Sequence, residues 1–482
     1  MEIPVILSSM HAQTGTVISP SRPFIAGIAQ GIRVVVRTLP NLAVHAVFSA
    51  LDRVEQLAFS PNGSLVLAVV PSQGVVHVWS VDDQDWHCRI DAGLIGVSRA
   101  TFHPTSSQNI LVWSDFNLRL EIWNINSGNR GHLNNVKGAL AIGGKHAALV
   151  SRNRLKDAVQ IVNIDENDEK NNLNFSVVQC FLVPGVGDLA GLVWTSSGTG
   201  LVAFESCLSS RVHLIDLKGQ ILCSHNLYPD SLELGVKVHA HSRTILALGC
   251  FDQTVRIFSI KDSLTFLATV DLKSDEIHVI DDCPVVLRET LGGEATLRER
   301  NMYLLGGANK EGFPVEYRDA PREETANEKL NVVKIPGIAR CTPITSVSNK
   351  KNAPVRGGVI DLKMSPDGAY LAAQTDEKSS VIFLLDVAKM KITDILIHRQ
   401  PVRCMRWNPS HIANKNQLAV VTGDSRVLIW NPTMDNRTVE MNDPSFQAQD
   451  VQWTPDGTVL LVEDKEKVSS VQLEISKENY GG

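Results

Sequence analysis

The stretch VEQLAFSPNGSLVLAVVPSQGVVHVWSVDD (Val54–Asp83) contains three apolar segments separated by two turns. Its first segment ends in Phe-Ser-Pro, its third ends in Trp-Ser, and apolar residues recur at every second position in VVHVW. Such alternation is typical of half-buried β-strands. Similar stretches begin at Ala100, Val359 and Val402, so the unit is repeated along the chain.

The repeat has a nearly constant length. Its first turn contains a proline at positions 20, 61, 104, 366, 409 and 455, so successive turns within each run are 41–46 residues apart. Weaker turns persist between these two runs, near Gly143, Ser197 and His241. A period of about 40–45 residues with four strands per repeat is the signature of WD-repeat propeller blades. We therefore predict an all-β WD-repeat β-propeller, because a β-sandwich would explain the short strands but not the fixed period.

Nine units can be counted. They cover approximately residues 11–50, 51–93, 94–138, 139–183, 184–229, 230–272, 357–399, 400–443 and 444–476. Blades 1–6 are thus predicted within residues 1–272, an insert at 273–356, and blades 7–9 within residues 357–482. Propellers typically have about 4–8 blades, so a ring of eight blades and two smaller propellers stay open as alternatives. We favour a single large ring of about nine blades, because no linker separates two plausible closed sets.

The two ends of the chain are predicted to meet. The last unit shows only three strands, and a short apolar strand at Ile3–Leu7 is available to complete it. Such pairing would place residues 1–10 at the point where the ring closes and would hide two sheet edges.

The insert at residues 273–356 does not follow the period. Its central stretch, residues 316–329 (EYRDAPREETANEK), is rich in charge and poor in apolar residues, a composition that favours a solvated, partly disordered loop. A docking segment that folds on a partner is the alternative. The apolar pieces that flank it, at residues 278–280, 284–287 and 332–335, are expected to supply extra strands to the neighbouring blades.

Composition restricts the class of protein. The net charge of −6 offers no broad attraction to nucleic acid or to an anionic membrane. No run of about 18 apolar residues occurs, and the start of the chain has no basic region followed by an apolar core. The eight cysteines form no Cys-x-x-Cys pair and fall mostly in apolar strand patterns, so we expect buried free thiols in a reducing, cytoplasmic compartment.

Motifs that carry chemistry are weak throughout. The nearest match to a phosphate-binding loop is Gly143-Gly-Lys145-His146, which lacks the hydroxyl residue and the correctly spaced first glycine. His239 and His241 share one side of a strand but have no third candidate metal ligand. No Gly-x-Ser-x-Gly elbow is present. We therefore predict no catalytic residue, no metal and no cofactor, and a binding platform in place of an enzyme.

Six strings go beyond what an ordinary blade requires. They are WHCRIDAG (Trp86–Gly93), DFNLRLEIW (Asp115–Trp123), LAGLVW (Leu189–Trp194), GVKVH (Gly235–His239), FDQTVRIF (Phe251–Phe258) and PVRCMRW (Pro401–Trp407). Together and in this order they resemble the WD repeat-containing protein 8 family of centrosomal and spindle-pole proteins. The resemblance covers most of the chain from about Leu51, whereas the first 50 residues match only by blade pattern and the insert differs in sequence.

The resemblance implies a non-enzymatic scaffold. Such proteins pair with a coiled-coil partner at the centrosome or spindle pole body, help to anchor microtubule minus ends, in some lineages with a minus-end-directed kinesin or γ-tubulin complexes, and are linked to centriolar satellites and cilium assembly. The family offers no catalytic residue to transfer to this chain. A propeller in a translation- or RNA-associated complex is the alternative, against which the acidic balance and the lack of a basic aromatic surface argue.

Residues for partner contact are suggested by blade geometry alone. Loops between the second and third strands open on one face of a propeller, so the candidates include Asp115, Phe116 and Asn117 in the third unit. The corresponding loop of the fourth unit and the outer strand of the second unit add Arg152, Asn153, Arg154, Trp86, His87 and Arg89. We expect Trp86 to pack in the core. Phe116 is the favoured anchor for a partner, because packing within the blade does not require an aromatic residue at the tip of a loop.

Overall fold

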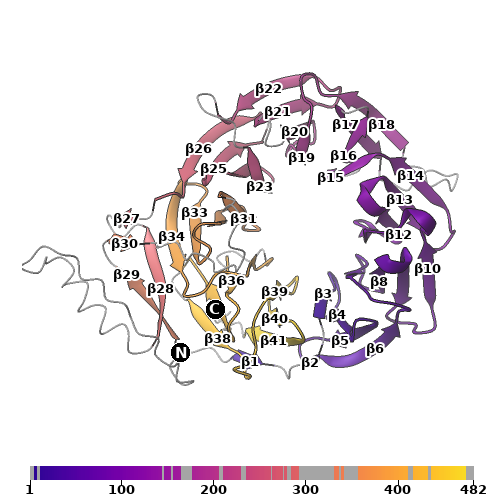
Figure 1. The fold of residues 1–482 in the computed structure, drawn as a ribbon, viewed down its shortest axis with the longest axis horizontal. Coiled ribbons are helices and arrows are strands. Elements are labelled where there is room, and N and C mark those ends of the chain that lie inside the picture. The colour runs from indigo at the N-terminus through magenta and orange to yellow at the C-terminus, as the bar shows by residue number, and fades with distance from the viewer. Residues whose placement is uncertain are drawn as a thin grey trace, which may run out of the picture.

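The computed structural model describes residues 5–7, 11–12, 14–143, 146–153, 156–163, 176–205, 210–228, 235–261, 263–274, 276–278, 284–291, 330–335, 338–340, 357–410, 416–432 and 436–473. Within these residues, nine sheets are arranged around one axis (Figure 1). Most of them are four consecutive antiparallel strands, numbered outward from the axis. The predicted nine-bladed propeller is therefore confirmed, and the alternatives of eight blades or two smaller rings are wrong.

Six blades precede the insert. Each of them contains four strands. They are β3 (Thr14–Ile18), β4 (Phe24–Ala29), β5 (Arg33–Thr38) and β6 (Ala43–Ser49) in blade 1; β7 (Gln56–Phe59), β8 (Leu65–Val70), β9 (Val75–Ser80) and β10 (His87–Asp91) in blade 2; β11 (Arg99–His103), β12 (Ser106–Trp113), β13 (Arg119–Asn124) and β14 (Arg130–Asn134) in blade 3; β15 (Val136–Gly143), β16 (His146–Asn153), β17 (Lys156–Asn163) and β18 (Ser176–Leu182) in blade 4; β19 (Leu189–Trp194), β20 (Gly200–Glu205), β21 (Arg211–Asp216) and β22 (Ile221–Asn226) in blade 5; and β23 (Val236–His241), β24 (Ile245–Cys250), β25 (Thr254–Ser259) and β26 (Thr265–Asp271) in blade 6.

Three blades follow the insert. They are β31 (Val359–Met364), β32 (Tyr370–Thr375), β33 (Val381–Asp386) and β34 (Lys391–Ile397) in blade 7; β35 (Cys404–Trp407), β36 (Leu418–Val421), β37 (Arg426–Trp430) and β38 (Arg437–Glu440) in blade 8; and β39 (Asp450–Trp453), β40 (Val459–Glu463) and β41 (Lys467–Leu473) in blade 9. Three short 3-10 turns, η1 (Pro71–Gln73), η2 (Gly93–Ile95) and η3 (Asp115–Asn117), lie in the loops of blades 2 and 3.

Apolar packing between neighbouring blades holds the ring together. The described residues form nine apolar clusters, and each lies at one of the nine seams between adjacent blades. This arrangement follows from the period of two, because alternate residues of a strand face the preceding and the following blade. Strand β8 shows the alternation, since Val66 and Ala68 pack toward blade 1 and Leu67 packs toward blade 3.

The turns carry the aspartates that the sequence places before the third strands. Asp252 accepts hydrogen bonds from the backbone N–H of Thr254 at 3.2 Å and from its hydroxyl at 2.6 Å. In blade 8, Asp424 accepts one from the backbone N–H of Arg426 at 3.1 Å. A short carboxylate thus closes the tight turn before the strand, as expected for this residue type.

The closing seam differs from the other eight. Strand β1 (Val5–Leu7) pairs antiparallel with β41 and is the outermost strand of blade 9, and β2 (His11–Ala12) pairs with β41 as well. Its apolar cluster has only three buried members, Ile25, Leu42 and Leu461. Polar contacts add to it, because Glu463 accepts a hydrogen bond from the hydroxyl of Thr16 at 2.8 Å and Ser470 donates one to the carbonyl of Pro40 at 2.6 Å.

The insert contributes strands in two places. Strand β28 (Val285–Leu291) pairs in parallel with β34, and β29 (Leu330–Ile335) pairs antiparallel with β28, so blade 7 has six strands. A separate two-stranded sheet contains β27 (Glu276–His278) and β30 (Ile338–Arg340). The apolar pieces at residues 284–287 and 332–335 thus join a neighbouring blade. The charged stretch at residues 316–329 lies outside the described residues.

The cysteines depart in part from the expected burial. Cys250 is buried, Cys88, Cys223 and Cys404 are half-buried, and all are free thiols. The prediction of burial is wrong for Cys180, which is exposed because it lies on the outermost strand of blade 4. The other three cysteines lie outside the described residues. No helix in the described part of the chain is long and apolar enough to cross a membrane.

Candidate functional site

The candidate site lies on one face of blades 1–4. Loops between the second and third strands and loops between consecutive blades open on this face. We call the loops at residues 30–32, 50–55, 71–74, 92–98 and 114–118, together with Asn135, the loop rim. They follow one another around the ring in the order of the blades (Figure 1).

Direct contacts join the first loops of the rim. The backbone N–H of Ala50 donates to the carbonyl of Ile32 at 2.8 Å, which ties the second loop to the first. Ser72 donates its hydroxyl to Asp52 at 2.8 Å, and this bond connects the second loop with the third. The backbone N–H of Ala92 then donates to the carbonyl of Gly74 at 3.1 Å. The loops therefore form one continuous surface.

The continuity extends into blade 4. Gly96 lies so close to Asp115 that a Cβ atom at this glycine would be 2.1 Å from the carboxylate. Beyond this contact, the backbone N–H of Asn135 donates to the carbonyl of Leu118 at 2.7 Å, and that of Arg152 donates to the carbonyl of Asn135 at 2.9 Å. The structure thus brings the predicted loop of blade 3 and Arg152 of blade 4 onto the same surface.

Phe116 is held at the tip of the rim in an unusual backbone conformation. Its φ is +57° and that of Asn117 is +53°, both in the left-handed region. Asparagine tolerates this region, whereas phenylalanine rarely adopts it, and such residues cost about 1–3 kcal/mol each. The turn is fixed by Ser114, whose carbonyl accepts from the N–H of Asn117 at 3.2 Å and whose hydroxyl accepts from the N–H of Arg119 at 2.8 Å.

Apolar side chains are exposed along the rim. Phe116 is 92% exposed, Leu51 is 69% exposed and Leu94 is fully exposed. Ile32 and Leu118 on the same loops are also exposed. A row of exposed apolar side chains on a continuous surface is a feature of protein interaction sites. The motifs considered in the sequence missed all of these except Phe116, although Gly93-Leu-Ile-Gly96, an apolar pair between glycines in a connecting loop, was the signal available for Leu94.

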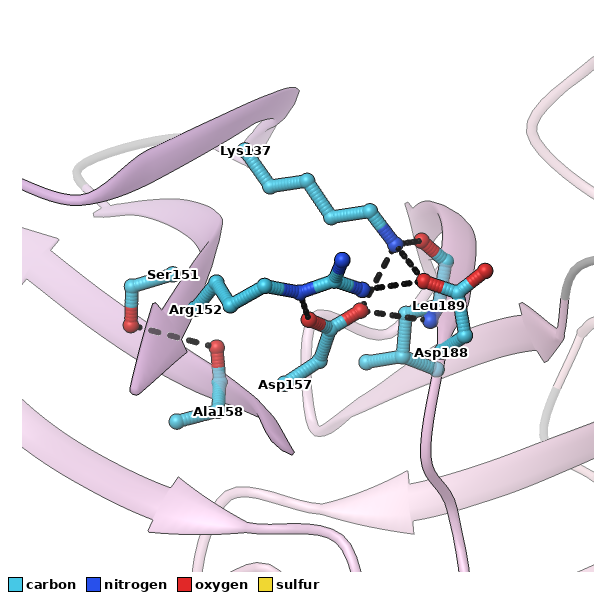
Figure 2. A network of polar contacts seen from close by, with 7 residues as sticks. All are labelled: Lys137, Ser151, Arg152, Asp157, Ala158, Asp188 and Leu189. Carbon is cyan, nitrogen blue, oxygen red and sulfur yellow. Dashed lines mark hydrogen bonds and ion pairs between the residues drawn. The ribbon is translucent and has the colours of Figure 1, made fainter. Parts of the chain in front are cut away.

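Arg152 belongs to a polar network at the end of the rim (Figure 2). Its Nε donates to Asp157 at 2.8 Å, and its terminal nitrogen pairs with Asp188. Lys137 donates from Nζ to Asp157 at 2.7 Å and also pairs with Asp188. Asp157 is completely buried, and it accepts a further hydrogen bond from the backbone N–H of Leu189 at 2.7 Å. The network therefore fastens blade 4 to blade 5.

The charges of this network stabilise one another. Burial alone would raise the pKa of Asp157, but the hydrogen bonds from Arg152, Lys137 and Leu189 outweigh it and hold that pKa below its ordinary value. The hydrogen bonds to Asp157 and Asp188 raise the pKa of Arg152. Arg152 therefore stabilises the contact between blades 4 and 5, and its guanidinium is partly exposed at the rim. Asn153 ends β16, and Arg154 lies outside the described residues.

The candidates of the second blade lie elsewhere. His87 is opposite Trp79 in the register of β9 and β10, whereas Asp91 is opposite Val75, the first residue after the rim loop. Trp86 and His87 are therefore on the outer wall, toward the end of the strand farther from the rim, and Arg89 is midway along the strand. Trp86 is partly buried and packs against the cluster between blades 2 and 3. The structure does not bring these three residues together with Phe116.

His87 instead takes part in an aromatic stack. Its Nε2 is 3.0 Å from Nδ1 of His77, and both rings stack with Trp79, which stacks in turn on Phe48 of blade 1. Burial lowers the pKa of His77 to about 4, with smaller contributions from the charges of His87 and Arg89. The buried imidazole is therefore neutral at physiological pH.

This stack predicts sensitivity to acid. Because the pKa of His77 is about 4 in the folded chain and 6.5 in its ordinary state, the unfolded chain binds the proton first. The stability that neutral His77 contributes should be complete above pH 6.5 and lost progressively between about pH 6.5 and pH 4. The melting temperature, measured by circular dichroism at a series of pH values, should fall less steeply over this interval in His77→Phe than in the unaltered chain. Equal slopes of melting temperature against pH in the two chains would show that His77 does not cause the acid sensitivity.

Sites for chemistry are not evident in the described residues. Among them, no group of three or more His, Cys, Asp or Glu side chains is placed to hold a metal ion. A shallow groove of about 430 Å³ lies at the closing seam, lined in part by Thr16, Glu55, Asp450 and Glu463. Burial raises the pKa of Glu463, whose contacts with Thr16 close the ring. The groove is therefore explained by its structural role.

Similarity to known proteins extends over nearly the whole chain. No family model matches the sequence. The WD repeat-containing protein WRAP73 of Mus musculus is 25% identical over 468 residues, which cover 96% of this chain and 94% of that protein. The described chain is a nine-bladed β-propeller similar in sequence to a WD-repeat protein. Among solved structures, the C-terminal WD40 domain of Sif2 is similar over 96% of this chain and 96% of its own, with 10% sequence identity and a TM-score of 0.46.

Proposed function

We propose that this WD-repeat propeller is a non-enzymatic scaffold of the WD repeat-containing protein 8 type, and that its loop rim binds a coiled-coil protein partner at microtubule-organising centres. There it would support anchoring of microtubule minus ends at the spindle pole, spindle organisation and assembly of centriolar satellites and cilia. The cytoplasmic and centrosomal location and the partners, including a minus-end-directed kinesin or γ-tubulin complexes, are inferred from the resemblance of the sequence strings.

One observation carries the binding role. Phe116 is almost fully exposed and has a strained left-handed backbone, so neither packing nor turn geometry explains a phenylalanine there. Residues kept in rare backbone conformations cluster at functional sites, and exposed aromatic residues are frequent anchors in interfaces. Leu51, Leu94 and Leu118 are further exposed apolar side chains of the loop rim, on which an amphipathic helix of a coiled-coil protein can lie.

The proposal predicts that stability and binding respond in opposite directions. Phe116→Gly removes the anchor and relieves the left-handed strain, so the melting temperature should stay constant or rise slightly while partner capture falls roughly tenfold or more. Phe116→Ala with Asn117→Ala should weaken capture to a similar extent. Affinity purification from dividing cells with quantitative mass spectrometry measures capture, and thermal unfolding of the purified chains measures stability.

Leu222→Ala is the matched control, because Leu222 is an exposed apolar residue on the outer wall of blade 5. It should capture as much coiled-coil protein as the unaltered chain. Equal capture by Phe116→Gly and the control would sink the assignment of the rim. Salt-sensitive recovery of RNA in place of a coiled-coil protein would favour the translation- or RNA-associated alternative.

A further inference from the structure

The outermost strands of several blades share one pattern. In blade 7, β34 has a bulge at Thr393, after which residues 394–397 pair regularly with β33. These four residues also form the parallel ladder with β28, from Val285 opposite Asp394 to Arg288 opposite Ile397. The outer edge of blade 7 has therefore accepted an additional strand at its four regular positions.

Blade 4 repeats this pattern in the same register. The bulge of β18 is at Val178, and residues 179–182 pair regularly with β17. Counted from the bulge, Cys180, Phe181 and Leu182 occupy the positions of Ile395, Leu396 and Ile397. Among the described strands, none pairs with the outer edge of β18. Blade 4 thus offers the site that β28 occupies in blade 7.

Burial at the two sites shows what the added strand does. Ile395 and Leu396 are almost completely buried, because Val286 of β28 packs in the same cluster as Ile395 and Leu287 packs in the same cluster as Leu396. Ile397 is only 9% exposed, whereas Leu182 at the equivalent position is 54% exposed. Cys180, at the position of the buried Ile395, is exposed too. The apolar residues that an added strand would cover are therefore uncovered in blade 4.

The other outer strands are less suited to accept a strand. Strands β10, β14 and β38 pair without the bulge that precedes the four-residue run in blades 4 and 7. The last position of the four-residue run is Ser49 in blade 1, Asn226 in blade 5 and Asp271 in blade 6. Only blades 4 and 7, among those that follow this pattern in the described chain, have a large aliphatic residue there. β18 has no charged residue.

We propose that β18 is a docking edge for an extended segment of a partner protein, which adds in parallel to β18 as β28 adds to β34. The bound segment contributes backbone hydrogen bonds to the free edge and alternating aliphatic side chains that cover Leu182 and its neighbours. Its sequence resembles that of β28, whose aliphatic residues Val285, Val286 and Leu287 meet the same register in blade 7. This edge is separate from the loop rim.

A peptide with the sequence of residues 284–291 (PVVLRETL) is the probe, labelled with fluorescein and titrated with the full chain in an anisotropy assay. We expect saturable binding that weakens at least tenfold in Leu182→Lys, because a charge on the edge opposes pairing. Leu222→Lys, which places the same charge on the outer strand of blade 5, should bind as the unaltered chain does. Thermal unfolding of both variants verifies that they are folded.

Two further peptides separate strand addition from unspecific apolar binding. One is N-methylated at residues 285 and 287 and the other at residues 286 and 288, so that each blocks the hydrogen bonds of one edge of the peptide. Strand addition requires that one pattern abolishes binding and the other leaves it nearly intact. Equal loss with both patterns would exclude strand pairing.

Several outcomes would overturn the proposal. They are absence of saturable binding, equal affinity of Leu182→Lys and the unaltered chain, or dimerisation of the chain that Leu182→Lys abolishes, which would make a second copy the occupant. Phe116→Gly should bind the peptide with unchanged affinity. A negative result for β18 therefore does not contradict the proposal for the loop rim, and a negative result for the loop rim does not contradict the proposal for β18.

Discussion

A chain that lacks residues 1–9 should melt roughly 3–5 °C below the full chain, because it loses about 3–5 kcal/mol of unfolding free energy at the seam where the ring closes. The deletion removes β1 and leaves an open edge on β41, whose Val468 and Val471 are completely buried in the full chain. Exposed apolar surface and lost ladder hydrogen bonds both contribute.

The position of the deletion explains the size of the effect. At the closing seam only Ile25, Leu42 and Leu461 are buried between the blades, whereas the other eight seams of the described chain have larger clusters. The pairing of Val5 with Leu473 therefore supports the weakest junction of the ring. Differential scanning calorimetry measures the melting temperature directly.

Rescue in trans provides the control. A peptide of residues 1–9 binds only the folded ring, so at high concentration it should restore part of the lost melting temperature by mass action. A peptide with the same composition in scrambled order should not. A shortened chain that melts like the full chain, with or without peptide, would show that β1 does not stabilise the closure.

The propeller could be predicted from the sequence because its information is local and repeated. The alternation in VVHVW predicts a β-strand, and the period of the turns predicts how many four-stranded sheets exist. The sequence does not indicate in the same way which strand the insert strands pair with. Residues 284–287 are plainly apolar, but their parallel pairing with β34 joins positions about 110 residues apart, and no turn fixes such a register.

The candidate site was predictable in part. The loop position of Phe116 follows from the blade pattern, whereas its left-handed backbone does not, because phenylalanine itself disfavours that conformation. Arg152 was suggested as a contact for a partner protein, but its guanidinium already pairs with Asp157 and Asp188 of its own chain. His87 and Arg89 were suggested as partner contacts on an outer strand of the second unit, and both lie on the outer strand β10, away from Phe116.

Lys378 is a residue whose role the sequence conceals. It lies in the polar turn between β32 and β33, where a lysine is normally solvated, yet it is only 1% exposed. Its Nζ donates to the carbonyls of Leu272, Lys273 and Ser274 at 2.9, 2.8 and 2.7 Å. These carbonyls follow β26 directly, where the chain leaves blade 6 for the insert. One buried ammonium group thus fixes the root of the insert to blade 7.

Lys378→Met is expected to lower the free energy of unfolding by about 3–5 kcal/mol. Three charge-assisted hydrogen bonds of about 1.5–3 kcal/mol each are lost and their acceptors stay buried, but part of this loss is offset because methionine carries no charge that must be desolvated. Methionine nearly preserves the volume, and it can contact the Phe383 ring through its sulfur where the ammonium now lies at 5.9 Å. The loss therefore isolates the hydrogen bonds from packing. Chemical denaturation of the full chain measures it.

Lys389→Met is the matched control in the same blade. Its ammonium pairs with Asp386 at 3.1 Å, but the side chain is 69% exposed, so the cost should be below about 1 kcal/mol. Hydrogen exchange adds a positional test, because Lys378→Met should lose protection first at residues 272–274 and in β28, which both depend on the same junction. Equal stability of the two variants, or exchange that accelerates uniformly over all nine blades, would show that Lys378 does not anchor the insert.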